Sequence, residues 1–166
     1  IVVLIAIFAP WLAPGDAFSS NLSQALQAPS SQHWFGTDKL GRDVLSRIIY
    51  GTQLSLFMGV SIVVIMVSIG TIIGAVAGYF GGKIEMVLMR LADIMLSFPG
   101  VVLAIAIAGI LGGSIVNTII ALSVVGWAKY ARLVRSMTLK VRGEEYVTAA
   151  VMMGASTTTI LRRHII

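Results

Sequence analysis

Two long stretches of this 166-residue chain contain no charged residue, and they constrain its fold more than any other feature. They cover residues 48–82 and 94–128, 35 residues each. A soluble domain carries about 25% charged residues to solvate its surface, whereas this chain has 11%, and 57% of its residues are hydrophobic. Much of its surface must therefore face lipid, and the predicted fold class is an all-α, polytopic membrane helical bundle.

The charge-free stretches predict three membrane spans. Residues 54–80 are long enough for one crossing of a hydrocarbon core of about 30 Å. A single helix over residues 94–128 would be about 50 Å long, which is too long for one span. The break at Gly112-Gly113-Ser114 instead predicts a hairpin of two spans, residues 86–111 and 115–134.

Local features refine these spans. Pro99 lies inside the span at residues 86–111 and should bend it by removing one backbone hydrogen bond. Gly70, Gly74 and Gly78 are spaced by four, the pattern of small residues that lets two helices approach closely in lipid. The simplest interpretation is packing within this subunit. Residues 1–9 are apolar but too short to cross alone, so we interpret them as the end of a truncated first span.

The basic residues predict the orientation. Nine of the twelve Lys and Arg residues follow the span at 54–80, on segments that lie on one side of the membrane, and the positive-inside rule makes that side cytoplasmic. The loop at residues 10–53 is then outside. This rule explains the basic excess without a nucleic-acid partner.

Two charged clusters leave alternatives open. In the outer loop, the i,i+4 pairs Asp38–Arg42 and Asp43–Arg47 predict a short helix. It is either an interfacial lead-in to the span at 54–80 or a docking platform for an external partner. Near the cytoplasmic start of the next span, Arg90 and Asp93 stand at i,i+3, where they form either a structural ion pair or a substrate contact.

The cytoplasmic segment at residues 135–166 is predicted to carry two short helices. Glu144 and Glu145 place negative charge in the first turn of one helix, where the macrodipole favours it. Gly154 can end that helix in a left-handed conformation, and Ser156 can cap a second helix through Ile160 and Leu161. Ala149 and Ala150 leave the surface shallow, so another protein can approach. The segment is either a rigid knob for a partner or an ordinary amphipathic connector.

These residues resemble known motifs. Residues 145–156, followed by Arg163-His164-Ile165, resemble the EAA loop of ABC importer permeases, with Thr148 in place of the motif's Glu and His164 at its Ile position. Residues 34–47 (WFGTDKLGRDVLSR) resemble the signature of the C-type permease subunit of dipeptide, oligopeptide and nickel importers. Residues 77–82 and 89–95 fit the same branch.

The resemblance implies a six-span subunit of the cell inner membrane, with both termini cytoplasmic and the fifth and sixth spans beyond Ile166. It also implies a second, similar permease subunit, two ATP-hydrolysing subunits and an extracytoplasmic substrate-binding protein. ATP and Mg would be bound by those partners, so no cofactor is expected in this chain. The residues that would couple the chain to an ATPase subunit are Glu145, Tyr146, Thr148, Ala149, Ala150, Gly154, Ala155 and Ser156.

Two other classes of protein are the alternatives, a membrane-embedded enzyme and a passive channel. A membrane-embedded enzyme needs a nucleophile with a base, paired carboxylates or metal ligands at similar depth. The predicted spans offer only Asp93, and the chain has no cysteine and no phosphate-binding Gly-x-x-x-x-Gly-Lys-Ser/Thr loop, so we predict no catalytic residue and no metal site. A passive channel would not need a cytoplasmic knob. Peptide versus nickel as the substrate stays open.

Overall fold

The computed structural model describes residues 1–160, and this part of the chain is helical throughout apart from loops and one isolated antiparallel bridge between Thr37 and Asp43. The predicted all-α class is therefore confirmed for these residues. The chain divides into two compact units, Ile1–Val60 and Ser61–Ile166. Each is described by itself below.

The first unit contains three short helices and the beginning of a long one. The short helices are α1 (Val2–Ile7), α2 (Ala9–Leu12) and the 3-10 helix η1 (Leu22–Gln24), and the long helix is α3 (Val44–Phe80). Ala6 of α1 and Ala9 of α2 are both buried. The side-chain amide of Gln53 donates to the carbonyl of Ala6 at 2.8 Å, which ties α3 to α1.

The prediction of a separate short helix at residues 38–47 is wrong. Residues 37–43 form a turn, and α3 runs without interruption from Val44. Gly41 has a φ of +73°, and a Cβ at this position would collide with the carbonyl of Asn21. The Asp38 carboxylate accepts hydrogen bonds from the N–H groups of Leu40 and Arg42. Such local bonds compete with a helix, so the i,i+4 spacing of Asp38 and Arg42 supports a turn instead.

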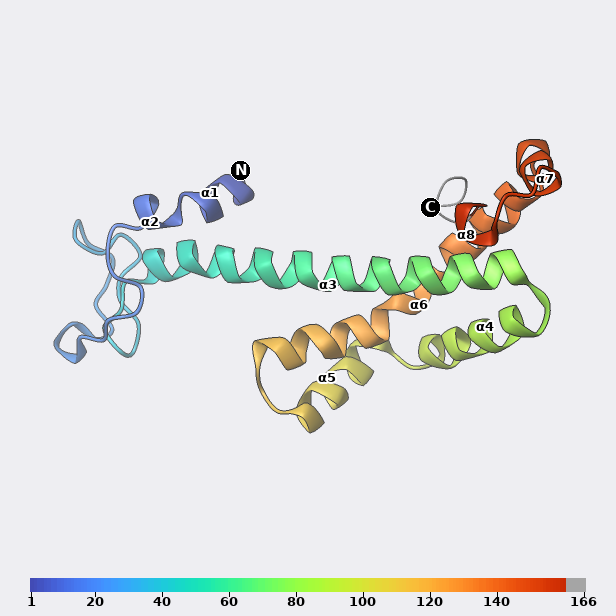
Figure 1. The fold of residues 1–166 in the computed structure, drawn as a ribbon. Helices are drawn as coiled ribbons and strands as arrows, with labels where there is room; N and C mark the ends of the chain where they lie inside the picture. The colour runs from blue at the N-terminus through green and yellow to red at the C-terminus, as the bar shows by residue number, and fades with distance from the viewer. Residues whose placement is uncertain (161–166) are drawn as a thin grey trace. The chain divides into compact units, whose positions relative to one another are not determined.

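The second unit contains the rest of α3 and five further helices. These are α4 (Gly82–Ser97), α5 (Gly100–Leu111), α6 (Ile115–Arg142), α7 (Glu145–Met152) and α8 (Thr157–Ile160). Both α4 and α5 pack against α6 (Figure 1). Ser114 caps α6 by accepting from the N–H of Asn117, and Gly112 before it has a φ of +91°, so the chain turns at Gly112-Gly113-Ser114.

The bend at Pro99 is sharper than the loss of one hydrogen bond predicts. The span predicted at residues 86–111 is two helices, α4 and α5, which meet at 90°. Phe98, the residue before the proline, is extended and ends α4, because Pro99 disfavours the helical conformation there. By length and composition, α3 is the helix in the described part of the chain that can cross a membrane alone, and the α4–α5 pair adds a second crossing if it is one span.

A seam of glycines joins α3 to α6. A Cβ at Gly70 would lie 2.5 Å from the Tyr130 Cβ, and one at Gly78 would lie 2.7 Å from the Thr138 Cβ. At Gly74, between them, it would meet the backbone of α6. The glycines therefore let α3 and α6 touch nearly backbone to backbone, which confirms the predicted packing within this subunit.

Candidate functional site

The connection from α6 to α7 begins the candidate coupling site. α6 ends at Arg142, and Glu144 stands in an extended conformation at the N-cap of α7. The carbonyl of Glu144 accepts from the N–H groups of Val147 and Thr148, both at 3.2 Å, which starts the helix. Glu145 lies in the first turn, where its negative charge complements the positive end of the helix dipole.

The turn between α7 and α8 is tightly defined. The N–H of Ala155 donates to the carbonyl of Ala150, and the N–H of Gly154 donates to the carbonyl of Val151, both at 3.0 Å. These two bonds make a Schellman motif, which needs a left-handed residue at its centre. Gly154 supplies it with a φ of +82°, as the sequence predicts. Ser156 then caps α8 by accepting from the N–H of Thr159.

The two faces of α7 differ in burial. Val147 and Ala150 are buried, as is Ile160 of α8. The prediction that Ala150 shares a shallow exposed surface with Ala149 is wrong, because only Ala149 faces outward. Ala155 is half-buried in the turn. The other predicted coupling residues are exposed: Glu145, Tyr146, Thr148, Gly154 and Ser156.

Two methionines complete the exposed surface of this site, and sequence reasoning did not select them. Met152 is 83% exposed and Met153 is 82% exposed, at the end of α7. Large flexible apolar side chains at a surface favour contact with a partner, because methionine adapts its shape to what it touches. The sequence signal for these methionines is their spacing: each lies four residues after Thr148 or Ala149, which places it on the same face of the helix. We call α7, the Gly154 turn and α8 the knob.

Ion pairs connect α4 to the helix that carries the knob. The guanidinium of Arg135 on α6 donates from Nε to the Glu85 carboxylate at 2.6 Å, and from a second nitrogen to the same oxygen. Asp93 pairs with Arg132, also on α6. The predicted pair between Asp93 and Arg90 is therefore wrong. Arg90 is exposed on α4, and in the described residues the partner of Asp93 comes from 39 positions further along the chain.

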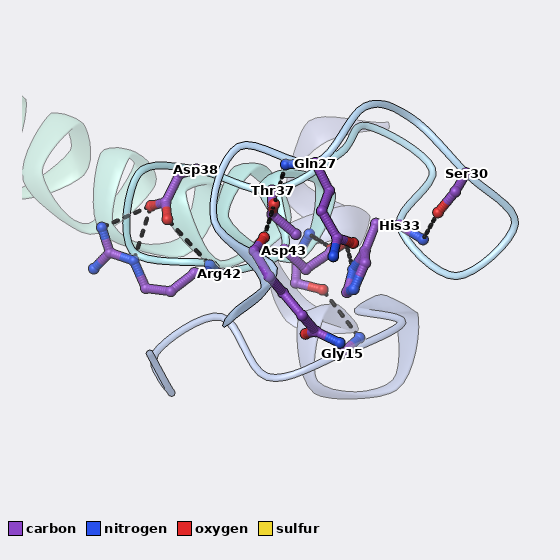
Figure 2. A network of polar contacts seen from close by, with 10 residues as sticks. Gly15, Gln27, Ser30, His33, Thr37, Asp38, Arg42 and Asp43 are labelled. Carbon is purple, nitrogen blue, oxygen red and sulfur yellow. Dashed lines mark hydrogen bonds and ion pairs between the residues drawn. The ribbon is translucent and has the colours of Figure 1, made fainter. Parts of the chain in front are cut away.

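The loop between α2 and α3, which is predicted from the sequence to lie outside the membrane, holds a polar network around Asp43 (Figure 2). One Asp43 oxygen lies 3.0 Å from His33 Nδ1, and the other accepts from the Ser46 N–H at 2.7 Å. Burial raises the pKa of Asp43, but the hydrogen bonds from Ser46 and His33 outweigh it and lower the pKa overall. The carboxylate therefore stays ionised and caps the first turn of α3. Ser46 Oγ in turn accepts from the N–H of Gly15 at 3.0 Å.

A second part of this network centres on Asp38. Its carboxylate pairs with Arg42 at 2.7 Å and also with Arg47, in addition to its two backbone bonds. The hydrogen bond from the Arg42 side chain is the main reason that the pKa of Asp38 lies well below its ordinary value. The predicted pair of Asp38 with Arg42 is confirmed. The predicted pair of Asp43 with Arg47 is wrong, since Arg47 binds Asp38 instead.

These pKa shifts predict acid sensitivity of the outer loop. The lowered pKa of Asp38 contributes stability that is fully present above the ordinary value of about 3.9 and is lost as pH falls through the lower folded value. We expect the Leu40 and Arg42 amides to lose hydrogen-exchange protection, corrected for intrinsic rates, below about pH 4. In Asp38→Asn the protection should be low at all pH values. Asp16→Asn should keep the wild-type pH profile at Leu40, because in the described part of the chain the Asp16 carboxylate accepts from Phe18 and Ser19 and not from residues 37–43. A flat wild-type profile would contradict this account.

Comparison with known proteins places the chain in a family. Residues 70–166, more than half of the chain, match the family described as the inner membrane component of binding-protein-dependent transport systems. The chain belongs to this family. The matched region of this transport component begins in the glycine seam of α3 and includes the α4–α6 ion pairs and the knob.

Curated relatives extend the similarity over the outer loop. The dipeptide transport system permease protein DppC of Alkalihalophilus pseudofirmus is 46% identical over 99% of this chain and 54% of its own length. The probable D,D-dipeptide transport system permease protein DdpC of Escherichia coli is 42% identical over all of this chain and 56% of its own length. The oligopeptide transport system permease protein OppC of Bacillus subtilis is 39% identical, again over the whole chain and 54% of the relative.

The chain therefore spans about half the length of the curated relatives that it matches. These relatives are named as permease proteins, and the family is a component of transport systems rather than a group of enzymes.

Proposed function

We propose that this chain is part of a multi-pass inner-membrane permease subunit of an ATP-driven peptide importer, coupled to an ATPase subunit through the knob. The observation that carries the proposal is the Schellman turn at Gly154, which fixes α7 against α8 with the exposed residues of α7 facing outward. The proposed partners are a second permease subunit, two ATPase subunits and an external substrate-binding protein. The ATPase subunits would hold ATP and Mg.

The packing of the second unit supports a mechanical role for the knob. α7 follows α6 after two residues, α6 holds α4 through the Glu85–Arg135 and Asp93–Arg132 pairs, and α6 holds α3 through the glycine seam. A force on the knob would therefore move α3, α4 and α6 together. We propose that ATP binding in the partner closes the ATPase pair and rocks this helix group between two states of the permease, a rigid-body change biased by a ligand bound elsewhere.

Peptide is the proposed substrate class because three relatives, 39–46% identical to this chain, are named as dipeptide or oligopeptide permeases. A relative named as a glutathione transport system permease protein, from Escherichia coli, is 44% identical over the whole chain, and glutathione is itself peptide-like. Nickel is the alternative substrate. Among the described residues no group of three His, Asp or Glu is placed to hold a metal ion.

The test compares two substitutions at Gly154 in the full-length permease. Gly154→Val forces a β-branched residue into a left-handed backbone, at a cost of about 1–3 kcal/mol, which should distort the turn. Gly154→Asn adds a polar side chain of similar bulk that tolerates this conformation. Among the described residues, no further atom lies within 4 Å of the added Cβ, so the backbone conformation is the variable being tested. The measurement is recovery of the ATPase subunit in a membrane pull-down, together with ATP-dependent peptide uptake.

We expect the wild-type and Gly154→Asn proteins to retain the ATPase subunit and transport. Gly154→Val should be present in the membrane at normal level but should lose most of both. Normal uptake by Gly154→Val would contradict the coupling role of the knob. If the wild-type permease retains no ATPase subunit, the knob is an ordinary connector and the importer function fails.

A further inference from the structure

A mostly apolar cavity lies in the second unit beside the break between α4 and α5. Its volume is about 460 Å³, which falls within the usual range of about 300–1,000 Å³ for small-molecule sites. The helices α3, α4, α5 and α6 all contribute to its lining. Its apolar side chains include Met66, Met95, Leu96, Phe98 and Val101. Such a lining accommodates an apolar group of variable shape, because methionine is flexible and polarizable.

One cation stands in this apolar lining. Lys129 of α6 is the charged residue among the described residues that line the cavity. In residues 1–160 the structure gives it no ion pair, whereas the acids of α4 are paired with Arg132 and Arg135. Lys129 is exposed, so its ammonium group is accessible to an anion that enters the cavity.

The backbone of α5 adds a smaller positive contribution. Pro99 is the N-cap of α5 and makes no side-chain capping bond, and Gly100 and Val101 line the cavity. The first α5 amide to bond within the helix is that of Leu103, which donates to Pro99. The amides before it are available at the positive end of the helix dipole. The cavity thus combines an apolar lining with a positive potential that comes mainly from Lys129 and to a smaller extent from the N-terminus of α5.

We infer that this cavity binds the carboxylate of the transported substrate through the Lys129 ammonium group, with an apolar side chain of the substrate against the methionines. This inference rests on the proposed peptide importer and adds a substrate-binding residue to it. Charge complementarity selects the occupant, because a cation such as a metal ion would be repelled and a neutral ligand would leave Lys129 unpaired. An anionic lipid headgroup would offer a similar charge, and the dependence of uptake on the fraction of anionic lipid distinguishes it from a peptide carboxylate.

The test is a double-mutant cycle between the protein and the substrate. The assembled importer with its binding protein is placed in proteoliposomes, and ATP-dependent uptake is measured for the dipeptide Ala-Phe and for its C-terminal amide. The permease is wild type, Lys129→Met or Lys129→Arg. Lys83→Met, an exposed lysine of α4 that does not line the cavity, is the matched control. Any effect of amidation on the binding protein is the same for each variant and cancels in the ratio.

We expect Lys129→Met to raise the KM for Ala-Phe about tenfold or more, as for the loss of a charge-assisted hydrogen bond. The KM for the amide should change less than twofold. Lys129→Arg should remain close to wild type for both, and Lys83→Met should have no effect on either.

Equal effects of Lys129→Met on both substrates would overturn the inference. If those equal effects also depend on the fraction of anionic lipid, Lys129 is a lipid contact. If the wild-type importer takes up neither Ala-Phe nor peptides of three to five residues, the proposed peptide function fails and the inference falls with it. If the wild-type importer transports Ala-Phe and Lys129→Met changes the KM for Ala-Phe and for its amide by the same factor, only the inference fails.

Discussion

Gly74→Val is expected to separate α3 from α6 and to reduce the stability of the permease by about 2–3 kcal/mol, since overpacking a tight interface costs this much. A Cβ at Gly74 would collide with the carbonyl oxygen of Ala131, and it would lie 2.8 Å from the Val134 Cβ and 3.0 Å from the Arg135 N. Two of these atoms belong to the backbone of a helix, which cannot move aside as a flexible side chain can. The helices must therefore shift apart along the whole seam.

Gly59→Val is the matched control for this prediction. Gly59 also lies in α3, but within residues 1–160 a Cβ at this position would have no further atom within 4 Å. The same substitution there should change stability by less than about 0.5 kcal/mol, as is usual for surface positions. The measurement is the fraction of full-length permease that stays monodisperse in size-exclusion chromatography after heating in detergent. Equal midpoints for the two variants would show that α3 does not pack on α6 through Gly74.

The glycine seam could be predicted from the sequence because its signal is local. Spacing by four places Gly70, Gly74 and Gly78 on one face of a helix wherever that helix lies, and small residues on one face imply a close neighbour. The identity of the neighbour could not be read in this way. The contact with α6 depends on how the chain returns after the α4–α5 break, which involves residues about 60 positions further on.

The turn and helices of the knob could be predicted for the same reason, but the side of α7 that is buried could not. The Gly154 turn and the Ser156 cap depend on residues within a few positions, so their pattern is sufficient. Which side of α7 is buried depends on the helices packed around it, and Val147 and Ala150 lie on that buried side. The prediction that Ala150 is exposed was wrong because its burial depends on tertiary contacts, which the local pattern does not reveal.

The charged residues were the least predictable part of the chain. Arg90 and Asp93 are close in sequence, yet Asp93 binds Arg132, and Arg47 binds Asp38 rather than Asp43. Long side chains reach many partners, and a favourable local spacing contributes only about 0.2–0.5 kcal/mol, so tertiary geometry decides among them. Residues 38–42 form a turn rather than the predicted helix because Gly41 lies close to the carbonyl of Asn21. The spacing of charged residues in the sequence does not reveal this contact.

The Glu85–Arg135 pair leads to the second large effect, an expected loss of most transport activity when either charge is reversed alone. The two side chains are partly buried, 21% and 36% exposed, and Arg135 contacts the carboxylate through two nitrogens. Arg135→Glu would place two carboxylates against each other, and Glu85→Arg would place two guanidinium groups there. Two like charges in contact destabilise an interface by several kcal/mol when they are fully shielded from water. These two side chains are partly exposed, so solvent screening should reduce the destabilisation to about 2 kcal/mol.

The exchange Glu85→Arg with Arg135→Glu should restore most of the lost transport, because it returns opposite charges to the same two positions. Arg90→Glu is the control for charge reversal as such, since Arg90 lies exposed on α4 and has no ion pair within the described residues. Uptake and thermal stability are measured for all four variants. Recovery in the exchange variant means that the two side chains act as an ion pair that holds α4 to α6, the helix that carries the knob. If the exchange is no better than the single reversals while Arg90→Glu is normal, each residue has a separate role, and α4 is held to α6 by its apolar contacts alone.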